Sequence, residues 1–567
     1  MRRWRSFSSL MVLGLVLAAC QTGSSQSAGP TGSAAASAEG SHAPFTARSY
    51  PVDAPADCAY GGEFSQIKAV EELKVEFDLC YPDPAFLSKL AFTTNNILDS
   101  ADLEANMVNH LILAKPNGTG PYQFEEYQRG DHVTLKAFDG YWGDKAKAAE
   151  LVIQWNSEAA ARLLALQSGT VDGIDNPGPD DFATIKSDSS LTLYPREALN
   201  TMYVGMTNTF APFDNEKVRQ ALAQGIDRKR IVDNFYPEGS TVADYFTPCN
   251  VDFGCEGDPW YAFDKDAANA LLDDALGAGK RFSTHIYYRD VVRDYLPDVT
   301  VVATELQKQL QDNLGITADL VVQESGTFLD NSSAGLLDGL YLLGWIADYP
   351  DPTNFLDYHF NNSGNVQFGK IDASVTDPLK TGAQTLDEAA RKAAYAEANN
   401  AIKAFVPMVP IAHGASATVF KADVTGAHAS PFAREDFSKM DPGHSPLVWM
   451  QNAYPISLYC ADETDGETLR ICDNIFESLY KFGVGETTPS PGLATGCEPN
   501  DEATVWTCTL REGVKFHNGA SFDAGDVVDT FAVQWDLDHP LHIGRTGTFE
   551  YWAGLWGQFL NVPPAAS

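Results

Sequence analysis

Amphipathic helix patterns and short apolar strand patterns alternate along most of this chain, and this alternation restricts its fold more than any other feature. It is typical of α/β proteins, in which helices cover the faces of open sheets. With 567 residues, the chain is long enough for two or more domains. We expect Ser157 to cap the first helix, and Gly169 and Gly315 to end the first and third. The predicted helices cover residues 157–168, 214–224, 297–313 and 385–405. Strand patterns cover 69–79, with one slip at an expected turn, and 316–322 and 409–412.

Composition excludes several classes of protein. Hydrophobic residues make up 44% and aromatic residues 11% of the chain, which is enough for large cores. The chain has 39 lysine and arginine residues against 76 aspartate and glutamate residues, so its net charge is −37. Because such a charge repels phosphate backbones and anionic lipid surfaces, a nucleic-acid partner held by a basic face is excluded. A collagen-like chain and a multi-span membrane protein are excluded as well.

The first twenty residues predict export. A basic start at residues 2–5 precedes an apolar run at 10–19 that is too short to cross a bilayer, as in a signal segment. The stretch Leu17-Ala18-Ala19-Cys20 resembles the bacterial lipobox, in which the cysteine is lipidated and becomes the mature N-terminus. The alternative is an ordinary signal with a chance cysteine. Cleavage before Cys20 removes three arginines and no acid, which moves the net charge to −40.

Eight cysteines then remain in an oxidising compartment, where disulfides are favoured. Eight cysteines permit 105 pairings, so spacing alone does not decide the connectivity. A metal site is the competing interpretation, but the chain has no Cys-x-x-Cys pair and its histidines are scattered. Pairing of sequence neighbours suggests the disulfides Cys58–Cys80, Cys249–Cys255, Cys460–Cys472 and Cys497–Cys508.

Catalytic signatures are absent from the sequence. It contains no Gly-x-Ser-x-Gly elbow, no His-Glu-x-x-His pair, no Walker loop and no dinucleotide fingerprint. The stretch Gly118-Thr119-Gly120-Pro121-Tyr122 looks like a phosphate loop, but Pro121 removes an amide donor that such a loop needs. We interpret His517 as a turn residue beside a strand rather than as a catalytic base. We expect no enzyme activity, no cofactor and no metal ion.

Five stretches resemble the extracellular solute-binding proteins of the dipeptide/oligopeptide/nickel family (family 5), which serve ATP-driven importers. Each motif alone is modest, but together they span nearly all of residues 58–560 in an exported chain. They are Gly118-Thr119-Gly120-Pro121-Tyr122 with Tyr141-Trp142-Gly143, the run 162–172, the run 212–228, Gly344-Trp345-Ile346-Ala347-Asp348-Tyr349-Pro350-Asp351-Pro352, and Leu510-Arg511-Glu512-Gly513-Val514-Lys515-Phe516-His517.

The order of these stretches departs from the family. In the family, the segment similar to 510–517 comes near the N-terminus, whereas here residues 444–561 resemble the family's beginning placed behind its end. We therefore expect a circular permutation in which the loop Met440-Asp441-Pro442-Gly443 joins the family's ordinary ends. A shuffled or misassembled gene is the alternative. The permutation predicts that residues 505–510 lie in the same small subdomain as residues 74–79.

The resemblance implies a periplasmic-binding-protein type II fold, with two α/β lobes, a hinge and an extra small subdomain. The chain would cross between the lobes near residues 199–207 and again near 411–416. The expected division is a signal peptide (1–19), a lipidated tether (20–44), a small subdomain of lobe 1 (45–115 with 481–567), the core of lobe 1 (116–205 with 411–480) and lobe 2 (206–410).

Four residues are the candidates for ligand binding. Asp348 follows an apolar strand and matches the family aspartate that binds the peptide α-amine, although turn chemistry is the alternative. Trp345 matches a family tryptophan near the ligand, with a core role as the alternative. Arg293 stands where dipeptide binders place a carboxylate-binding arginine, with a solvated surface arginine beside Asp290 and Asp294 as the alternative. Tyr203, near the hinge, could line the cleft or serve packing.

The implied function is that of a lipid-anchored receptor on the outer face of the cell membrane or in the periplasm. It would capture di- or oligopeptides by closing its lobes and deliver them, as a monomer, to the membrane permease subunits of an ABC importer. A nickel chelate, a sugar or an opine-like solute is an alternative ligand. An exported hydrolase that uses a carboxylate pair, and a sensory or structural lipoprotein, are alternative functions.

Overall fold

The computed structural model describes residues 45–362 and 366–562. Within them the strands form three larger sheets and one two-stranded sheet, of β17 (Tyr480–Phe482) and β18 (Pro489–Pro491). The signal segment, the lipobox with Cys20 and the tether lie outside the described residues.

A seven-stranded mixed sheet is the centre of lobe 1. It contains β4 (Tyr122–Gln128), β5 (His132–Ala137), β6 (Glu150–Trp155), β7 (Gly173–Asp175), β8 (Leu191–Arg196), β15 (Ser416–Lys421) and β16 (Leu447–Gln451), with the helices α3 (Ala159–Gln167), α4 (Phe182–Ser187) and α13 (Gly466–Ile475). The strand order is β4-β5-β6-β16-β7-β15-β8. The central strand β16 runs parallel to β6 and β7, although it follows them far along the chain.

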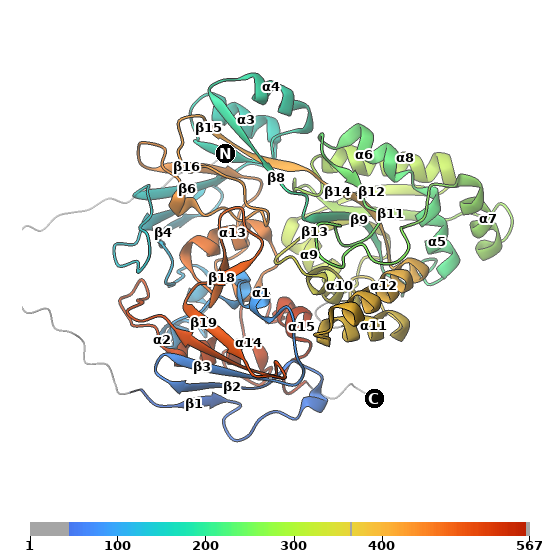
Figure 1. Cartoon of the computed structure of the whole chain (residues 1–567). Helices are drawn as coiled ribbons and strands as arrows, with labels where there is room; N and C mark the ends of the chain where they lie inside the picture. The colour runs from blue at the N-terminus through green and yellow to red at the C-terminus, as the bar shows by residue number, and fades with distance from the viewer. Residues whose placement is uncertain (1–44, 363–365, 563–567) are drawn as a thin grey trace, which may run out of the picture. The chain divides into compact units, whose positions relative to one another are not determined.

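A six-stranded sheet is the centre of lobe 2, on the right of Figure 1. Its order is β10 (Thr241–Val242), β14 (Met408–His413), β9 (Asn200–Met206), β13 (Leu340–Ile346), β11 (Ser283–Arg289) and β12 (Thr317–Gln323). Strands β9 and β13 are buried along nearly their whole length, as expected of a sheet covered on both faces. The helices of this lobe are α5 (Glu216–Gly225), α6 (Arg228–Phe235), α7 (Lys265–Leu276), α8 (Val299–Leu314), α9 (Ser325–Ser333), α10 (Pro352–Phe360), α11 (Ala373–Gln384) and α12 (Glu388–Phe405).

A five-stranded sheet forms the small subdomain. Its order is β1 (Arg48–Tyr50), β2 (Phe64–Glu71), β3 (Lys74–Leu79), β20 (Val505–Leu510) and β19 (Ala494–Pro499), with α1 (Phe86–Leu90), α2 (Ser100–Asn106), α14 (Ala524–Trp535) and α15 (Glu550–Trp556). The alternating burial of β3 directs Val75 and Phe77 into an aromatic core. At its centre, the Phe64 ring lies within 6.5 Å of six aromatic rings, those of Phe77, Phe86, Phe531, Trp535, Trp552 and Trp556.

The two connections between the lobes are short. The chain leaves β8 at Arg196 and enters β9 at Asn200, and it returns between His413 and Ser416. The Asn200 side chain ties the connections together: its Nδ2 donates to the Gly414 carbonyl (2.7 Å) and its Oδ1 accepts from the Gly414 N–H (2.8 Å). Strands β9 and β14 both belong to the sheet of lobe 2, so the crossings lie at 197–199 and 414–415. The expected boundaries at 205 and 411 therefore fall inside strands of lobe 2.

Several predicted helices and strands are present, although their first and last residues differ from those predicted. Helices α5, α8 and α12 and strands β12 and β14 lie where helices and strands were expected. Gly169 and Gly315 follow α3 and α8 with φ of 80° and 68°, in the left-handed region that favours glycine. The prediction that Ser157 caps α3 was wrong, because the N-cap is Glu158, whose N–H donates to the Asn156 side chain (2.9 Å).

All four predicted disulfides are present: Cys58–Cys80, Cys249–Cys255, Cys460–Cys472 and Cys497–Cys508. The last one joins residues that stand directly opposite each other on β19 and β20. Each bridge links positions that are also neighbours in the chain, with separations of 6 to 22 residues. The disulfides therefore stabilise local turns and hairpins and do not tie the lobes together.

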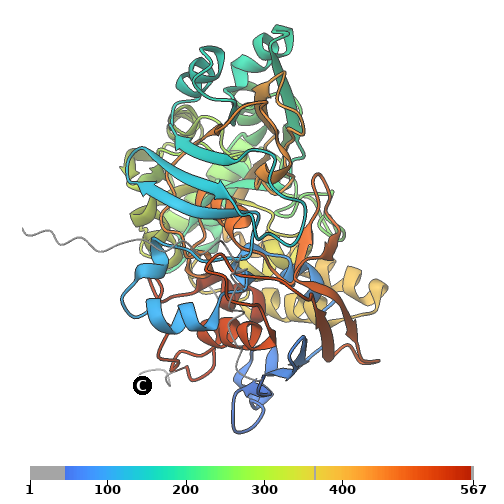
Figure 2. The ribbon, with the colours of Figure 1, turned by 90° about the vertical axis from the view of Figure 1, so that its left-hand side faces the viewer.

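Strands from opposite ends of the chain complete the small subdomain, as was predicted for 74–79 and 505–510. Strand β20 pairs antiparallel with β3, with Cys508 opposite Val75. The two ends of the described chain also meet, because the Asp536 carboxylate accepts hydrogen bonds from the Tyr50 hydroxyl and from Asn561 Nδ2. Figures 1 and 2 show blue and red segments together in the lower part of the molecule. A circular permutation requires both arrangements, and the permutation itself stays a prediction.

Two of the sequence motifs contact each other across the chain. The His517 ring accepts from the Gly118 N–H (3.2 Å) and lies 3.0 Å from the Gly120 carbonyl. A Cβ atom on Gly118 would lie 2.1 Å from the Ile475 carbonyl oxygen, so only glycine fits there. The glycine-rich loop is therefore a packing element against the end of α13, and His517 is a half-buried residue that contacts this loop, in line with the turn interpretation.

Restoring the family order of the chain should preserve the fold. We expect a rearranged chain, with residues 444–562 joined by a short flexible linker to residues 45–443, to form the same four disulfides, because the linker spans ends that already meet. Disulfide mapping by mass spectrometry and circular dichroism provide the measurement.

The matched control opens the chain inside β16, between Trp449 and Met450, which interrupts the central strand of lobe 1. We expect the control to misfold. The permutation would be contradicted if the two rearranged chains misfolded equally.

Candidate functional site

A cavity of about 80 Å³ lies between the two lobes, and all four candidate ligand residues line it. The C-terminal ends of the parallel strands β11 and β13 point to it, which is where open α/β sheets place ligand sites. Residues of both lobes and of the small subdomain line the cavity. From lobe 2 they include Tyr203, Arg289, Arg293, Asp294, Leu343, Gly344, Trp345, Ile346, Asp348, Tyr358 and His359. From lobe 1 they include Asp175, Asn176, Phe432, Ala433, Arg434, Asn452, Glu467 and Arg470, and from the small subdomain Tyr551.

Asp348 is a buried carboxylate with several partners. Its Oδ1 pairs with Nη1 of Arg434 (3.0 Å), and its Oδ2 accepts from Nδ2 of Asn354 (3.1 Å). The Tyr551 hydroxyl also bonds this carboxylate. Burial raises the pKa of Asp348 to about 6, against the lowering effect of Arg434 and the hydrogen bonds. The carboxylate is therefore ionised at neutral pH and lies within reach of the cavity.

Trp345 is held in the cavity wall by Asn354, which sequence reasoning missed. The Asn354 Oδ1 accepts from the Trp345 indole N–H (3.0 Å) and from the Asp348 backbone N–H (3.0 Å). The indole also stacks on the Tyr358 ring, with centroids 4.1 Å apart. One amide on α10 thus positions both the aromatic wall and the carboxylate. Asp348 therefore lies in the bend after β13, as the turn interpretation expected, and also lines the cavity.

Arg293 is buried and paired, so its interpretation as a solvated surface residue was wrong. Its guanidinium pairs with Oδ1 of Asp465 (2.7 Å) and Oε1 of Glu467 (2.9 Å), both at the start of α13 in lobe 1. These partners replace Asp290 and Asp294, which the sequence placed beside it. Arg293 therefore bridges the two lobes across the cavity.

Tyr203 lines the cavity from inside the core of lobe 2. Its side chain is fully buried, its hydroxyl donates to the Gln367 side chain (2.7 Å), and its ring contacts Phe246 and Phe368. The structure thus gives Tyr203 the packing role that was one of its two interpretations, at a position that still contributes surface to the cavity.

A network of buried charges borders the cavity, and Arg196 is at its centre. The Arg196 guanidinium donates to both oxygens of Asp294 (2.8 and 2.9 Å), to Asp175 (3.0 Å) and to Glu435 (2.7 Å). All four side chains are at most 2% exposed. Because Asp294 belongs to lobe 2, this cluster joins the lobes next to the first crossing.

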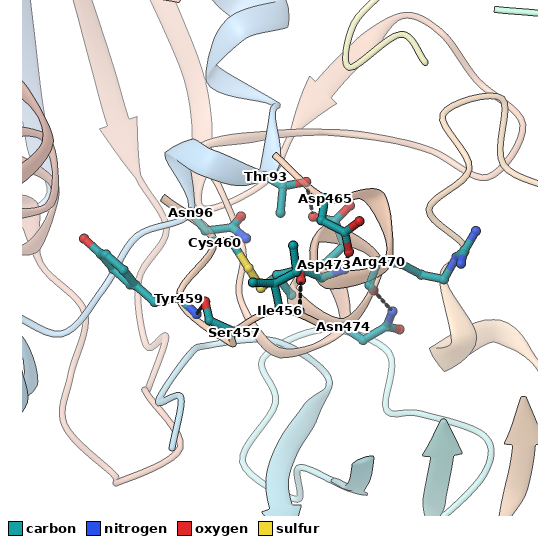
Figure 3. Close-up of a disulfide and its surroundings, with 12 residues drawn as sticks. Thr93, Asn96, Ile456, Ser457, Tyr459, Cys460, Asp465, Arg470, Asp473 and Asn474 are labelled. Atoms are coloured by element: carbon teal, nitrogen blue, oxygen red, sulfur yellow. Dashed lines mark hydrogen bonds between the residues drawn. A yellow bond between two sulfur atoms is a disulfide. The ribbon is translucent and has the colours of Figure 1, made fainter. Parts of the chain in front are cut away.

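Helix α13 extends the network. Arg470 pairs with Asp175 (2.6 Å), Glu435 (2.8 Å) and Glu467 (2.8 Å). The Cys460–Cys472 bridge fastens this helix to the preceding turn, and in Figure 3 the Arg470 side chain extends from the same helix away from the bridge. The disulfide therefore supports the helix that carries Glu467 and Arg470, which line the cavity, and Asp473, which pairs with Arg434.

The arginines decide which carboxylates stay ionised. Burial raises the pKa of Asp175, but Arg470 and Arg196 outweigh it and hold this pKa at about 2. The pKa of Glu435 is likewise lowered, because the same two arginines overcome its burial. For Glu467 burial is the stronger effect and raises the pKa to about 7, despite Arg293 and Arg470. Neutral pH thus leaves Asp175 and Glu435 fully charged.

Sequence reasoning missed the partners of the candidate residues because they are remote in the chain. Arg470 and Asp175 are 295 residues apart, and Arg434 and Asp348 are 86 apart. No spacing pattern connects such positions. The available signal was indirect: Asp175 comes shortly after the motif 162–172, and Arg470 and Glu467 lie in the segment that resembles the family's beginning.

No group of three or more His, Cys, Asp and Glu side chains that could hold a metal ion occurs within residues 45–362 and 366–562. Over the same ranges, none of the helices is both long enough and apolar enough to cross a bilayer.

Removal of the central guanidinium should destabilise the protein strongly. We expect Arg196→Met to lower the free energy of unfolding by about 3–5 kcal/mol, because Asp175, Asp294 and Glu435 stay buried with one partner fewer. Urea unfolding followed by tryptophan fluorescence measures the change.

The matched control is Arg129→Met, at an exposed position after β4, for which a change below about 0.5 kcal/mol is expected. Equal effects of the two substitutions would show that the buried network does not carry this stability.

Comparisons with known proteins agree with the fold. A sequence profile described as "Bacterial extracellular solute-binding proteins, family 5 Middle" matches residues 32–367 and 488–548, more than half of the chain. The dipeptide-binding protein of Escherichia coli (strain K12) is 29% identical over 384 residues, which cover 66% of this chain and 71% of that protein. Di/tripeptide-binding protein 1 of Pseudomonas aeruginosa (strain UCBPP-PA14) is 29% identical over 409 residues, covering 70% and 75%.

A solved structure shares the two-lobed architecture. The dipeptide binding protein from Pseudoalteromonas sp. SM9913, in complex with Met-Leu, matches with a TM-score of 0.62 and 26% identity, covering 67% of this chain and 75% of that one. Proteins of this family bind solutes for transport and are not enzymes. From the profile match, the two lobes and the cavity between them, we conclude that this chain belongs to the family 5 bacterial extracellular solute-binding proteins.

Proposed function

We propose that this protein is a lipid-anchored receptor that captures di- or oligopeptides between its lobes and delivers them to the permease of an ABC importer. The observation that carries the peptide assignment is the buried Asp348 in the interlobe cavity, at the end of β13. Support comes from relatives named as dipeptide- and di/tripeptide-binding proteins and from a related structure that holds Met-Leu.

Asp348 is suited to bind the ammonium group of a peptide. A carboxylate offers about four acceptor sites, so Asp348 can accept one hydrogen bond from a ligand ammonium in addition to those from Arg434, Asn354 and Tyr551. In a cavity closed to water, an ammonium needs such a partner to offset its desolvation. Trp345 lies beside the carboxylate and would cover the ligand with an apolar surface.

The carboxylate end of a peptide requires a cation. Arg293 lines the cavity, but its guanidinium already pairs with Asp465 and Glu467. A ligand carboxylate would compete with these groups for Arg293 or approach Arg434. We therefore place the stronger ligand contact at Asp348, with Arg293 as a secondary contact.

Delivery to a permease and attachment to the membrane complete the proposal. Family 5 proteins are extracellular solute-binding proteins, which fits an N-terminal signal followed by the lipobox-like stretch ending in Cys20. The Ser-, Gly- and Ala-rich residues 21–44 would separate the lipid from the binding lobes.

Neutralising Asp348 should weaken peptide binding. We expect Asp348→Asn to reduce dipeptide affinity by at least about tenfold in isothermal titration calorimetry, because the ligand ammonium loses its buried counter-charge. Arg434 keeps Asp473 as an ion-pair partner (3.0 Å), so the variant should remain folded. Asp319→Asn, at an exposed position on β12, is the matched control and should bind normally.

The pH dependence adds a second readout. The raised pKa of Asp348, about 6, means that the carboxylate takes up a proton as pH falls below that value, whereas a peptide α-amine loses its charge above about pH 8. Wild-type affinity should therefore be greatest between these limits, and its decrease on the acid side should be absent in Asp348→Asn. Unchanged affinity and an unchanged acid-side decrease in Asp348→Asn would refute the ammonium assignment.

Replacing Cys20 should release the protein from the membrane. We expect Cys20→Ser to abolish labelling by a fatty-acid analogue and to move the protein into the soluble exported fraction, because the acylated thiol is lost. Ser24→Ala, in the tether, should stay labelled and membrane-bound. Retained labelling of Cys20→Ser would contradict the lipid anchor without affecting the peptide assignment.

A further inference from the structure

The lobe 2 wall of the cavity contains a histidine with a buried, unpartnered acceptor. His359 lies on α10, is 4% exposed and lines the cavity. Its Nδ1 lies 2.6 Å from the Phe355 carbonyl oxygen. Since a carbonyl can only accept, Nδ1 carries the proton and Nε2 is an acceptor. Across residues 45–362 and 366–562, this Nε2 finds no hydrogen-bond donor.

Burial of the His359 ring keeps its Nε2 unprotonated and therefore able to accept a hydrogen bond. It lowers the pKa of His359 to about 3, against the smaller raising effect of the Phe355 carbonyl, so the ring is neutral throughout the physiological range. A buried polar atom without a partner costs free energy, and unpaired atoms of this kind in a native structure call for an explanation. A ligand that supplies a donor would remove that cost.

Aromatic rings surround His359. Its ring centroid lies 4.8 Å from Trp345, 4.8 Å from Phe246, 4.9 Å from Tyr358 and 5.9 Å from Tyr203. Trp345, Tyr203 and Tyr358 line the same cavity. This part of the cavity is therefore lined by aromatic rings, with His359 Nε2 as a hydrogen-bond acceptor among them.

The opposite lobe presents a second acceptor of the same kind. Asn452, just after β16, lines the cavity, and its Oδ1 has no donor among the described residues. Its Nδ2 donates to Asp175 (3.2 Å), which fixes the orientation of the amide. Both lobes thus offer acceptors to a ligand, and a donor-bearing ligand can satisfy them.

We propose that His359 is a specificity-determining residue that accepts a hydrogen bond from a hydroxyl or ring N–H on a ligand side chain. This inference rests on the proposed peptide-binding function. Tyrosine and tryptophan side chains combine an aromatic body, which suits the surrounding rings, with one such donor. A phenylalanine side chain would occupy the same place and leave Nε2 unpaired, and sites of this design reject the analogue that lacks the donor.

The test compares dipeptides that differ by one hydroxyl group. Calorimetry with the full-length protein would use Tyr-Ala against Phe-Ala and Ala-Tyr against Ala-Phe. In at least one pair, we expect the tyrosine peptide to bind about tenfold more tightly or better. This ratio isolates the hydroxyl contact, because a general structural defect would weaken both members of a pair.

Three variants assign the preference to His359. His359→Phe should reduce the ratio to about one, and His359→Gln should keep part of it, because an amide oxygen can replace Nε2 as acceptor. His285→Phe, on β11 and outside the cavity lining, is the matched control and should keep the wild-type ratio. If His359→Phe misfolds, the wild-type ratio and His359→Gln decide the question.

The outcomes separate this inference from the proposed function. Equal binding of both members in both pairs, or a full ratio in His359→Phe, would overturn the role of His359 while leaving peptide binding intact. Failure of the folded wild-type protein to bind any of the four dipeptides would overturn the peptide assignment and this inference with it.

Discussion

The arrangement of the two lobes depends on the burial of Arg196. A guanidinium that is fully removed from water needs hydrogen-bond acceptors around it, and Arg196 obtains the carboxylates of Asp175 and Glu435 from lobe 1 and of Asp294 from lobe 2. Arg293 forms a second bridge in the opposite direction, to α13. Separating the lobes would expose these groups to water or leave them unpaired. The charges can therefore pair fully only while the lobes are in contact.

The same charges shape what the cavity can bind. Its arginines are already paired with carboxylates of the protein, so an anionic ligand meets competition at each of them. A ligand with hydrogen-bond donors does not meet this competition. Asp348 can accept a further hydrogen bond, and His359 Nε2 and Asn452 Oδ1 have no donor among the described residues. The aromatic side chains around Trp345 cover the apolar part. Together these features favour a ligand with an ammonium group and a donor-bearing side chain.

The order of elements along the chain matters less than which strands can pair. Strand β16 is the central strand of the lobe 1 sheet, and β20 lies between β3 and β19 in the small-subdomain sheet, although both come from the C-terminal part of the chain. Sheet pairing fixes spatial neighbours and leaves the connecting loops free to vary. The meeting of Tyr50 and Asn561 at Asp536 shows how a change of connectivity could be accommodated there.

From the sequence alone, local periodicity predicted helices α5, α8 and α12 and strands β12 and β14, and pairing of neighbouring cysteines suggested the four disulfides. The motifs shared with the family pointed to Asp348, Trp345, Arg293 and Tyr203 as candidates, and the structure places all four around one cavity. Only the tertiary structure decided their partners. Arg434 for Asp348, Asn354 for Trp345 and α13 for Arg293 follow from packing that brings remote segments together. The crossings between the lobes were likewise placed by strand pairing, since β9 and β14 join lobe 2 through hydrogen bonds that no local pattern specifies.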